Sequence, residues 1–207
     1  MRGAWGRRGW GRSGGDGGEE WGPEIEDGAL PEPLGPDPAG SDGSGVRTPS
    51  NWAWRDGPVA QPGEAVVFDM DGVLSDAAGR QHFLERGHRD WDRFFEACGD
   101  DQVVEELARL LELLDPRLQV VLLTGRPFRV QPQTLAWLAR YGLRWDLLVM
   151  RSRGDYAQVT MFKRDAVDEL REYGFDLRLA FEDDPNNFAM FHAEGIPCVY
   201  IHSGYYD

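Results

Sequence analysis

Two aspartates stand where an apolar run breaks off, and their spacing suits them to act together on a ligand. Asp69 and Asp71 follow the run 65–68 (Ala-Val-Val-Phe), and Gly72 follows them directly. Side chains two positions apart in a strand point to the same face, and open α/β sheets bind ligands at the carboxyl ends of their strands. Converging carboxylates repel each other, so such a pair either holds a divalent cation or shares a proton. An ordinary acidic turn gives the same pattern, so the pair alone is a weak signal.

Reactive residue types also follow two later apolar runs. Thr-Gly-Arg stands at 124–126 and Glu-Asp-Asp at 182–184, each at the end of an expected strand, and Lys163 opens the helix before the second of these strands. Each has an ordinary interpretation: a turn, a solvated lysine, and a helix cap with its loop. Because parallel strands present their carboxyl ends at one edge of a sheet, we expect these side chains to converge on the aspartate pair.

Apolar β-rich runs alternate with amphipathic stretches from about residue 64 onward. The pattern predicts strands at 65–69, 119–124, 146–150, 178–182 and 198–202, and helices at about 89–98, 102–114, 131–141, 161–173 and 186–194. Near-continuous apolar strands that alternate with helices indicate an α/β fold, a Rossmann-like three-layer α/β/α sandwich around a mainly parallel five-stranded sheet.

The chain divides into two unequal parts. Residues 1–60 are rich in Gly, Pro, Ser and acidic groups and lack periodicity, so they cannot bury enough apolar surface to offset their ordering entropy. We expect a disordered tail there, with Trp52 and Trp54 as candidates to pack back on the domain. Residues 61–207 form the expected globular domain, and this length is ample for a core.

Composition narrows the classes of function. The 207 residues carry a formal net charge of -14, which argues against a broadly basic nucleic-acid binder but leaves room for a local basic groove. Cys98 and Cys198 lie far apart and indicate free thiols in a reducing compartment. No apolar run approaches the ~20 residues that span a bilayer, and no apolar core follows the N-terminal arginines as in a secretory signal. We therefore expect a cytoplasmic protein.

Motifs that occur in order along the chain resemble those of the haloacid dehalogenase (HAD) superfamily. The run 69–74 (Asp-Met-Asp-Gly-Val-Leu) is similar to the first motif and 122–126 (Leu-Leu-Thr-Gly-Arg) to the second. Lys163 is similar to the third motif and 181–184 (Phe-Glu-Asp-Asp) to the fourth. The resemblance covers nearly everything from Glu64 onward.

Within the superfamily, the chain most resembles the phosphatase domain of polynucleotide kinase-phosphatases. This closer resemblance is carried by 147–151 (Leu-Leu-Val-Met-Arg), Asp155, Lys163 and 181–184. It implies a phosphomonoester hydrolase that depends on Mg²⁺ and works through an aspartyl-phosphate. The implied partner is a phosphorylated substrate, such as a nucleic-acid 3′-phosphate end or a nucleotide.

The superfamily's roles carry over residue by residue. Asp69 would attack phosphorus, or would only bind metal, and Asp71 would protonate the leaving oxygen and then deprotonate the attacking water. Thr124 would hold phosphoryl oxygens, and Lys163 would compensate the charge on nucleophile and phosphate. The implied Mg²⁺ ligands are Asp69, the backbone carbonyl of Asp71, Asp183 and, through water or by orienting another ligand, Asp184. The implied substrate contacts are Thr124, Gly125 and Arg126.

Some side chains near these motifs have open roles. Arg126 contacts either the substrate phosphate or, with equal weight, the acidic cluster as a structural ion pair. Arg80, Arg151 and Arg153 are candidates for a local basic rim, with solvated surface as the default. The aromatic residues of the first expected helix, Trp91, Phe94 and Phe95, are expected in the core rather than as base-stacking groups.

The spacing of the motifs limits the size of any cap over the site. The interval from Leu74 to the helix at 102 is short, and one helix separates Thr124 from the third strand. We infer a minimal cap and an open site, which suits a bulky substrate. The charge of -14 weighs against a polynucleotide, because phosphate contacts demand cations. The alternatives are a phosphatase of a small metabolite or phosphoprotein, and a catalytically idle binding module.

Overall fold

The computed structural model describes residues 48–206 apart from 86–88, 153 and 155–156. Most of the expected tail therefore lies outside the described residues. Arg153 and Asp155, which the sequence singled out as a rim candidate and as part of the family resemblance, lie outside them as well.

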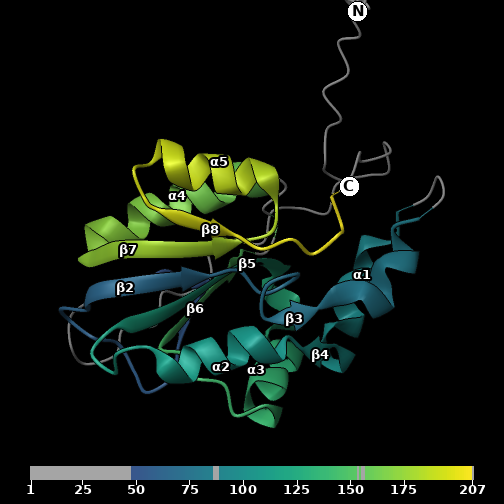
Figure 1. Cartoon of the computed structure of the whole chain (residues 1–207), viewed down its shortest axis with the longest axis horizontal. Helices are drawn as coiled ribbons and strands as arrows, with labels where there is room; N and C mark the ends of the chain where they lie inside the picture. Colours follow the sequence, from purple (N-terminus) through teal and green to yellow (C-terminus); the bar gives the residue numbers. More distant parts are fainter. Residues whose placement is uncertain (1–47, 86–88, 153, 155–156, 207) are drawn as a thin grey trace, which may run out of the picture.

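A six-stranded sheet forms the middle layer, with the strand order β1-β6-β5-β2-β7-β8 (Figure 1). The strands are β1 Trp52–Trp54, β2 Gly63–Phe68, β5 Gln119–Pro127, β6 Leu147–Arg151, β7 Phe175–Glu182 and β8 Cys198–Tyr200. β1 pairs antiparallel with β6, and every other pair in this sheet is parallel. The mainly parallel α/β fold that the sequence predicts is confirmed.

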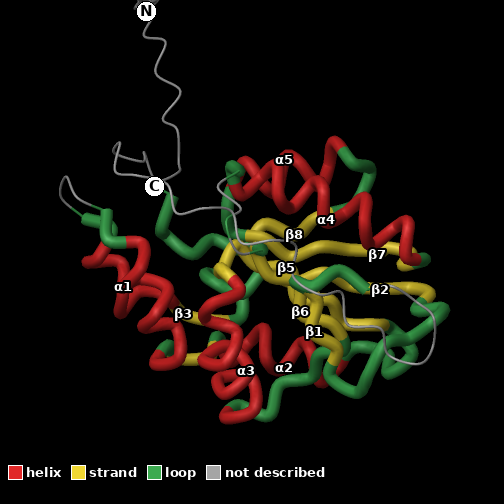
Figure 2. Tube along the Cα trace, turned by 180° about the vertical axis from the view of Figure 1, so that it is seen from behind, coloured by secondary structure: helices red, strands yellow, loops and turns green. Residues whose placement is uncertain are grey.

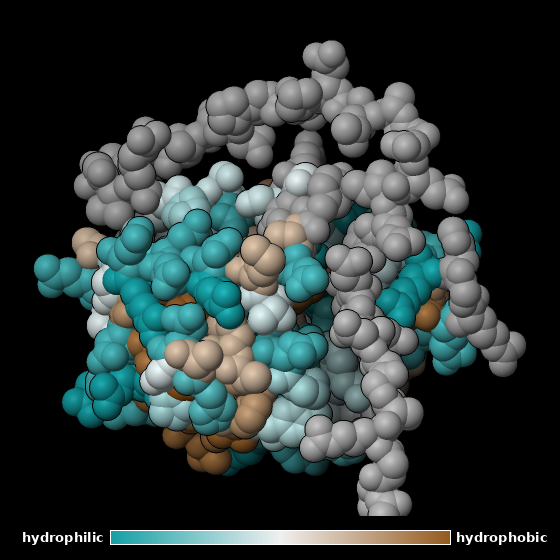
Figure 3. All heavy atoms as spheres, turned by 90° about the horizontal axis from the view of Figure 1, so that it is seen from above, coloured by the Kyte–Doolittle hydropathy of each residue, from teal (hydrophilic) through white to brown (hydrophobic). Residues whose placement is uncertain are grey.

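Helices cover both faces of the sheet. Figure 2 shows α4 (Val159–Tyr173) and α5 (Pro185–Ala193) on one side of the strands and α2 (Glu105–Leu113) and α3 (Gln131–Arg140) on the other. Because side chains alternate along a strand, β2 supplies both cores. Ala65 and Val67 pack with residues of α4 and α5, whereas Val66 and Phe68 pack with residues of α2 and α3. Hydrophilic residues dominate the outer surface seen over α4 and α5, with smaller hydrophobic patches between them (Figure 3).

The strand β1 is absent from the predicted five-stranded sheet and lies in the segment assigned to the tail. Its three residues are too few for a periodic signal, and aromatic packing fixes it in place. Trp52 is 7% exposed, and its ring centroid lies 5.1 Å from that of Tyr173 and 6.2 Å from that of Phe175. The amide of Asn51 donates to the carbonyl of Met150 at 2.8 Å. The sheet therefore begins before residue 61.

A small cap lies beyond the carboxyl ends of the strands, around α1 in Figure 1. It consists of β3 (Ser75–Asp76) paired antiparallel with β4 (Gln102–Val103), and of η1 (Ala77–Phe83), α1 (Trp91–Glu96) and η2 (Ala97–Asp100). The helix predicted from residue 102 begins at Glu105, because residues 102 and 103 pair with β3 instead. The minimal cap expected from the motif spacing is present.

The helices and the cysteines bear on two expectations from composition. Within the described ranges, no helix combines the length and the apolar character needed to cross a bilayer. Cys98 and Cys198 are both free thiols, as their separation in sequence predicts.

Replacing Trp52 tests whether β1 belongs to the folded core. Trp52→Ala removes a buried indole and should lower the free energy of unfolding by roughly 3–5 kcal/mol, measured by urea denaturation. Trp54→Ala, at the half-buried tryptophan of the same strand, should lower it by less. Equal, near-zero effects of the two substitutions would show that β1 does not pack on the sheet.

Candidate active site

The nucleophile candidate Asp69 comes directly after β2, and the backbone holds it beside the end of β7. Its N–H donates to the carbonyl of Phe181 at 3.0 Å. The chain then folds into a tight turn in which the N–H groups of Leu74 and Ser75 donate to the carbonyl of Met70 at 2.9 and 2.8 Å. The first motif is thus fixed by backbone hydrogen bonds.

Gly72 lies in this turn with φ +82°, a conformation that favours glycine. A Cβ built at Gly72 would lie 1.9 Å from Oδ2 of Asp183. The absence of a side chain at this position therefore lets the carboxylate of Asp183 approach the turn of the first motif.

Lys163 joins the first and fourth motifs. It lies near the start of α4, is 1% exposed, and places Nζ 2.9 Å from Oδ1 of Asp69 and 2.6 Å from Oε2 of Glu182. Burial alone would lower the pKa of Lys163, but the two carboxylates outweigh it and raise that pKa. Lys163 is therefore held as an ammonium ion between two carboxylates.

Asp69, Glu182 and Asp183 form an acidic cluster in which one carboxylate oxygen of each lies within 4.8 Å of the others. Asp183 is 1% exposed, and neither of its carboxylate oxygens meets the full geometry of a hydrogen bond with a described residue, although the hydroxyl of Ser203 lies near enough to lower its pKa against the larger effect of burial. Burial raises the pKa of Asp183 to about 7. Buried carboxylates without partners are costly, and a hard divalent cation with oxygen ligands would satisfy them. The cluster fits Mg²⁺.

Asp71 faces a separate group of charges. Arg126 places Nε 2.9 Å and Nη2 2.5 Å from Oδ1 of Asp71, and Nη2 of Arg80 lies 2.5 Å from the same oxygen. The hydrogen bonds between described arginines and this carboxylate all involve Oδ1, and Asp71 lines the cavity described below. Burial would raise the pKa of Asp71, but the charges of the two arginines outweigh it and lower the pKa to about 2.

Arg126 and Arg80 both lie beneath the pocket rather than on its rim. Arg126 is 0% exposed and also donates to Oγ of Ser75 at 3.0 Å, while Arg80 is 2% exposed and contacts Oδ2 of Asp101 at 2.8 Å. Of the two roles left open for Arg126, the structure contains the ion pair with Asp71, and Arg126 is not among the residues that line the cavity. The expectation of a solvated or rim position for Arg80 is wrong, because η1 folds it onto the first motif.

One cavity of about 640 Å³ collects most of the residues that the sequence assigned to chemistry, with Asp183 and Arg126 outside its lining. Asp69, Asp71, Thr124, Gly125 and Lys163 all line it. The hydroxyl oxygen of Thr124 accepts from the N–H of Arg126 at 3.2 Å. A Cβ at Gly125 would lie 3.3 Å from Cγ1 of Val159, so this glycine lets β5 approach the start of α4 closely.

The fourth motif divides its acidic residues between two tasks. Asp184 also lines the cavity, but its Oδ1 accepts from the N–H of Asn186 at 2.8 Å and caps α5. Glu182, to which the sequence assigned no role, holds Lys163 and also accepts from the N–H of Asp184 at 3.2 Å. The sequence could have indicated a role for Glu182, because this residue ends an expected strand and stands next to Asp183.

The comparisons with known proteins agree with this geometry. The model of the family described as "Polynucleotide kinase PNKP phosphatase domain" matches residues 63–206. A search among curated proteins finds no match.

Two solved structures share the fold. A chain in "Structure of Pnkp1/Rnl/Hen1 complex" is 23% identical with a TM-score of 0.58, and the match covers 75% of this chain and 50% of that one. A chain in "Structure of the Pnkp1/Rnl/Hen1 RNA repair complex" is 24% identical with a TM-score of 0.59, and the match covers 74% and 47%. This chain thus spans about half the length of either relative.

The family model covers the sheet apart from β1, the cap and every motif residue named above. This chain therefore belongs to the HAD-type family of polynucleotide kinase PNKP phosphatase domains, and it is a phosphatase.

Proposed function

We propose that the protein is a Mg²⁺-dependent phosphomonoester hydrolase that acts through an aspartyl-phosphate on Asp69, with the 3′-phosphate end of a nucleic acid as substrate. The observation that carries the proposal is the acidic cluster beside the cavity, where Asp69 contacts Lys163 and where the buried carboxylate of Asp183 has no basic partner among the described residues. A small metabolite or a phosphoprotein is the alternative substrate for the same chemistry.

The metal would be held by Asp69, Asp183 and the backbone carbonyl of Asp71, with Glu182 in the same cluster and Asp184 acting through water. When bound, Mg²⁺ neutralises charge so that a carboxylate can approach an anionic phosphoryl group. Gly72 supports this arrangement because it admits the Asp183 carboxylate to the turn.

The nucleophile in this proposal is a carboxylate oxygen of Asp69. It forms a bond to phosphorus while the bond from phosphorus to the leaving oxygen breaks. Burial raises the pKa of Asp69 above its ordinary value, and the ammonium of Lys163, which contacts Oδ1, opposes this effect and favours the charged form. Thr124 and Gly125 line the cavity where phosphoryl oxygens would sit.

Asp71 would move the protons. Because the arginines lower its pKa to about 2, Asp71 would first take up a proton when the anionic phosphate binds beside it. It would donate that proton to the leaving oxygen, then take one from the water that attacks the aspartyl-phosphate, which releases inorganic phosphate and restores Asp69. Arg80 and Arg126 fix Oδ1 of Asp71 and so orient Oδ2 toward the cavity. They would act as positioning residues rather than as substrate contacts.

The choice of substrate rests on the open site and on the family. The cap is small, and a cavity of about 640 Å³ is much larger than a phosphoryl group needs. The matched family is named for polynucleotide kinase, and the two solved relatives come from a Pnkp1/Rnl/Hen1 complex, one of them titled as an RNA repair complex. We also propose that the protein works with partner proteins in such an assembly. The cytoplasmic location expected from composition is part of the same proposal.

Substitution of the nucleophile tests the chemistry. Asp69→Asn should lower turnover of p-nitrophenyl phosphate by at least ~10³-fold, since each tenfold loss is about 1.4 kcal/mol of barrier, and should leave the fold intact. Wild-type turnover should require Mg²⁺. The exposed Asp176→Asn is the matched control and should be fully active. Full activity of Asp69→Asn would rule out the aspartyl-phosphate.

A panel of substrates separates the alternatives for the same site. Phosphate release would be measured from a 3′-phosphorylated oligonucleotide, a nucleotide, a sugar phosphate and a phosphopeptide. Preference for the oligonucleotide by kcat/KM is the expected result. An idle binding module would release no phosphate from any of them.

Substitution of Gly72 tests the link between the turn and the metal site. Gly72→Ala should displace Asp183 and raise the Mg²⁺ concentration for half-maximal activity by roughly 10- to 100-fold. Gly63→Ala is the matched control, with a similar φ of +72° but nothing within 4 Å of its Cβ. It should show only the backbone strain of about 1 kcal/mol in stability. Identical Mg²⁺ curves for the two variants would contradict a role for Gly72 at the metal site.

Substitution of Arg80 tests whether the positive charges around Asp71 stabilise the fold and orient that carboxylate. Arg80→Met leaves buried carboxylates with one cation fewer and should lower the free energy of unfolding by roughly 3–5 kcal/mol. Loss of orientation at Asp71 should lower kcat of the folded protein by roughly 10²-fold.

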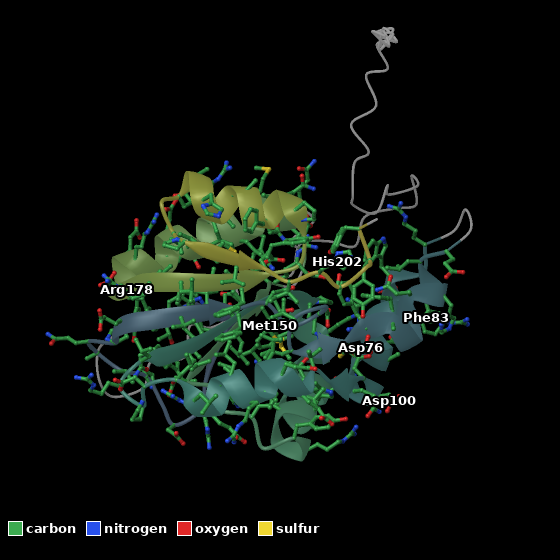
Figure 4. The ribbon with its side chains drawn as sticks, viewed as in Figure 1. Asp76, Phe83, Asp100, Met150, Arg178 and His202 are labelled. Atoms are coloured by element: carbon green, nitrogen blue, oxygen red, sulfur yellow. The ribbon has the colours of Figure 1, made fainter. Side chains whose placement is uncertain are left out.

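Arg178→Met is the matched control for Arg80. Arg178 contacts Asp176 and Glu64 on the surface, and its loss should cost less than about 1 kcal/mol. In Figure 4 it lies at the end of the sheet opposite Asp76, Phe83 and His202, far from the cap. Equal kcat values for the two variants would remove Arg80 from the mechanism.

A further inference from the structure

Two aromatic rings of the cap face the cavity that holds Asp69. Trp91 and Phe95, one turn apart on α1, both line the cavity and are only half-buried. Their ring planes are 25° apart, with centroids separated by 5.8 Å, so they present a stack. α1 lies beyond the carboxyl ends of the strands, at the same edge as the site (Figure 1).

Core packing explains their neighbour but not Trp91. Phe94 is buried, and the guanidinium of Arg80 lies 4.2 Å from its ring centroid. Phe95 packs at the margin of the hydrophobic core, whereas Trp91 belongs to neither hydrophobic cluster. The ring contacts of Trp91 are with Phe94 and Phe95. Packing in the hydrophobic core therefore does not account for the position of the Trp91 ring at the cavity wall.

The rest of the cavity wall suits a flat ring with a polar edge. Gln81 lines it on the cap side and Gln158 on the side of α4, so amide groups that donate and accept surround the aromatic wall. Tyr205 adds a further ring to the lining, and its hydroxyl donates to Oδ1 of Asp76 at 2.6 Å. Nucleobases combine an aromatic face with donors and acceptors at the edge, and they stack on aromatic side chains.

We propose that Trp91, supported by Phe95, is a stacking platform for the nucleobase of the nucleotide that carries the phosphate. This inference rests on the proposed phosphatase function and adds a specificity-determining residue to it. The expectation that Trp91 belongs to the core is replaced by a role in binding the leaving group. Trp91 takes no part in the bond changes at Asp69.

The test compares two substrates that differ only in the base. One is an oligonucleotide with a 3′-terminal thymidine 3′-phosphate, and the other has a tetrahydrofuran abasic residue in place of that thymidine. Trp91→Leu should lower kcat/KM for the first by roughly 5- to 150-fold, the range of base–aromatic stacking, mainly through KM. It should leave kcat/KM for the abasic substrate unchanged.

Two further variants separate stacking from damage to the cap. Trp91→Phe keeps a planar ring and should recover most of the loss, which also answers the question if Trp91→Leu fails to fold. Trp54→Ala, at a half-buried tryptophan whose ring stacks on Phe175 away from the cavity, should treat both substrates as the wild type does.

Failure of the stacking platform and failure of the proposed phosphatase function give different results. Equal losses on the base-bearing and abasic substrates would overturn the stacking platform while leaving the phosphatase intact. A larger loss on a phosphotyrosine peptide than on the oligonucleotide would place a different ring on Trp91 and also overturn it. Absence of Mg²⁺-dependent turnover of either oligonucleotide by the wild-type protein would defeat the proposed substrate, and the platform would fall with it.

Discussion

The site depends on how buried charge is balanced around the first motif. On one side of it, three carboxylates (Asp69, Glu182 and Asp183) surround the single ammonium group of Lys163. That group is short of positive charge, and its deficit is of the size that a divalent cation closes. On the other side, Asp71 and Asp101 are matched by the two arginines Arg80 and Arg126. The half of the site that we propose to bind metal thus lacks balancing positive charge, whereas the charges around Asp71, the proposed proton donor, are balanced by the protein alone.

This division follows from the geometry of one strand end. Asp69 still pairs with β7 through its N–H, so it stays with the fourth motif. Asp71 lies past the strand and turns toward the cap, where η1 and β5 supply the arginines. Spacing of two residues is therefore enough to place two carboxylates in different electrostatic surroundings, which suits two different roles in one reaction.

The sequence predicted most of the sheet and the convergence of the motifs, because both rest on strong local signals. Buried parallel strands are apolar along their length, and their carboxyl ends must share an edge. That reasoning brings Asp69, Thr124 and Lys163 together without any knowledge of the loops. β1 was not predicted, because a strand of three residues is too short to show a hydrophobic periodicity. Its contacts with Tyr173 and Phe175 become visible only in the structure.

The cap was the least predictable part of the site. An arginine in an irregular segment is expected to be exposed to solvent. The spacing of the sequence motifs does not show that η1 brings Arg80 into contact with Asp71 and Asp101. The same holds for Trp91, whose place at the cavity depends on how α1 and the preceding η1 pack over the site. The position of a side chain at the end of a strand can be predicted from the sequence. The position of a side chain on a short irregular segment cannot.

The antiparallel strand β1 also has a consequence for how the molecule behaves in solution. It occupies the outer hydrogen-bonding groups of β6 and becomes the edge strand itself. The described sheet therefore ends on both flanks in a strand of only three residues, β1 and β8. Short edge strands offer little template for strand addition between molecules.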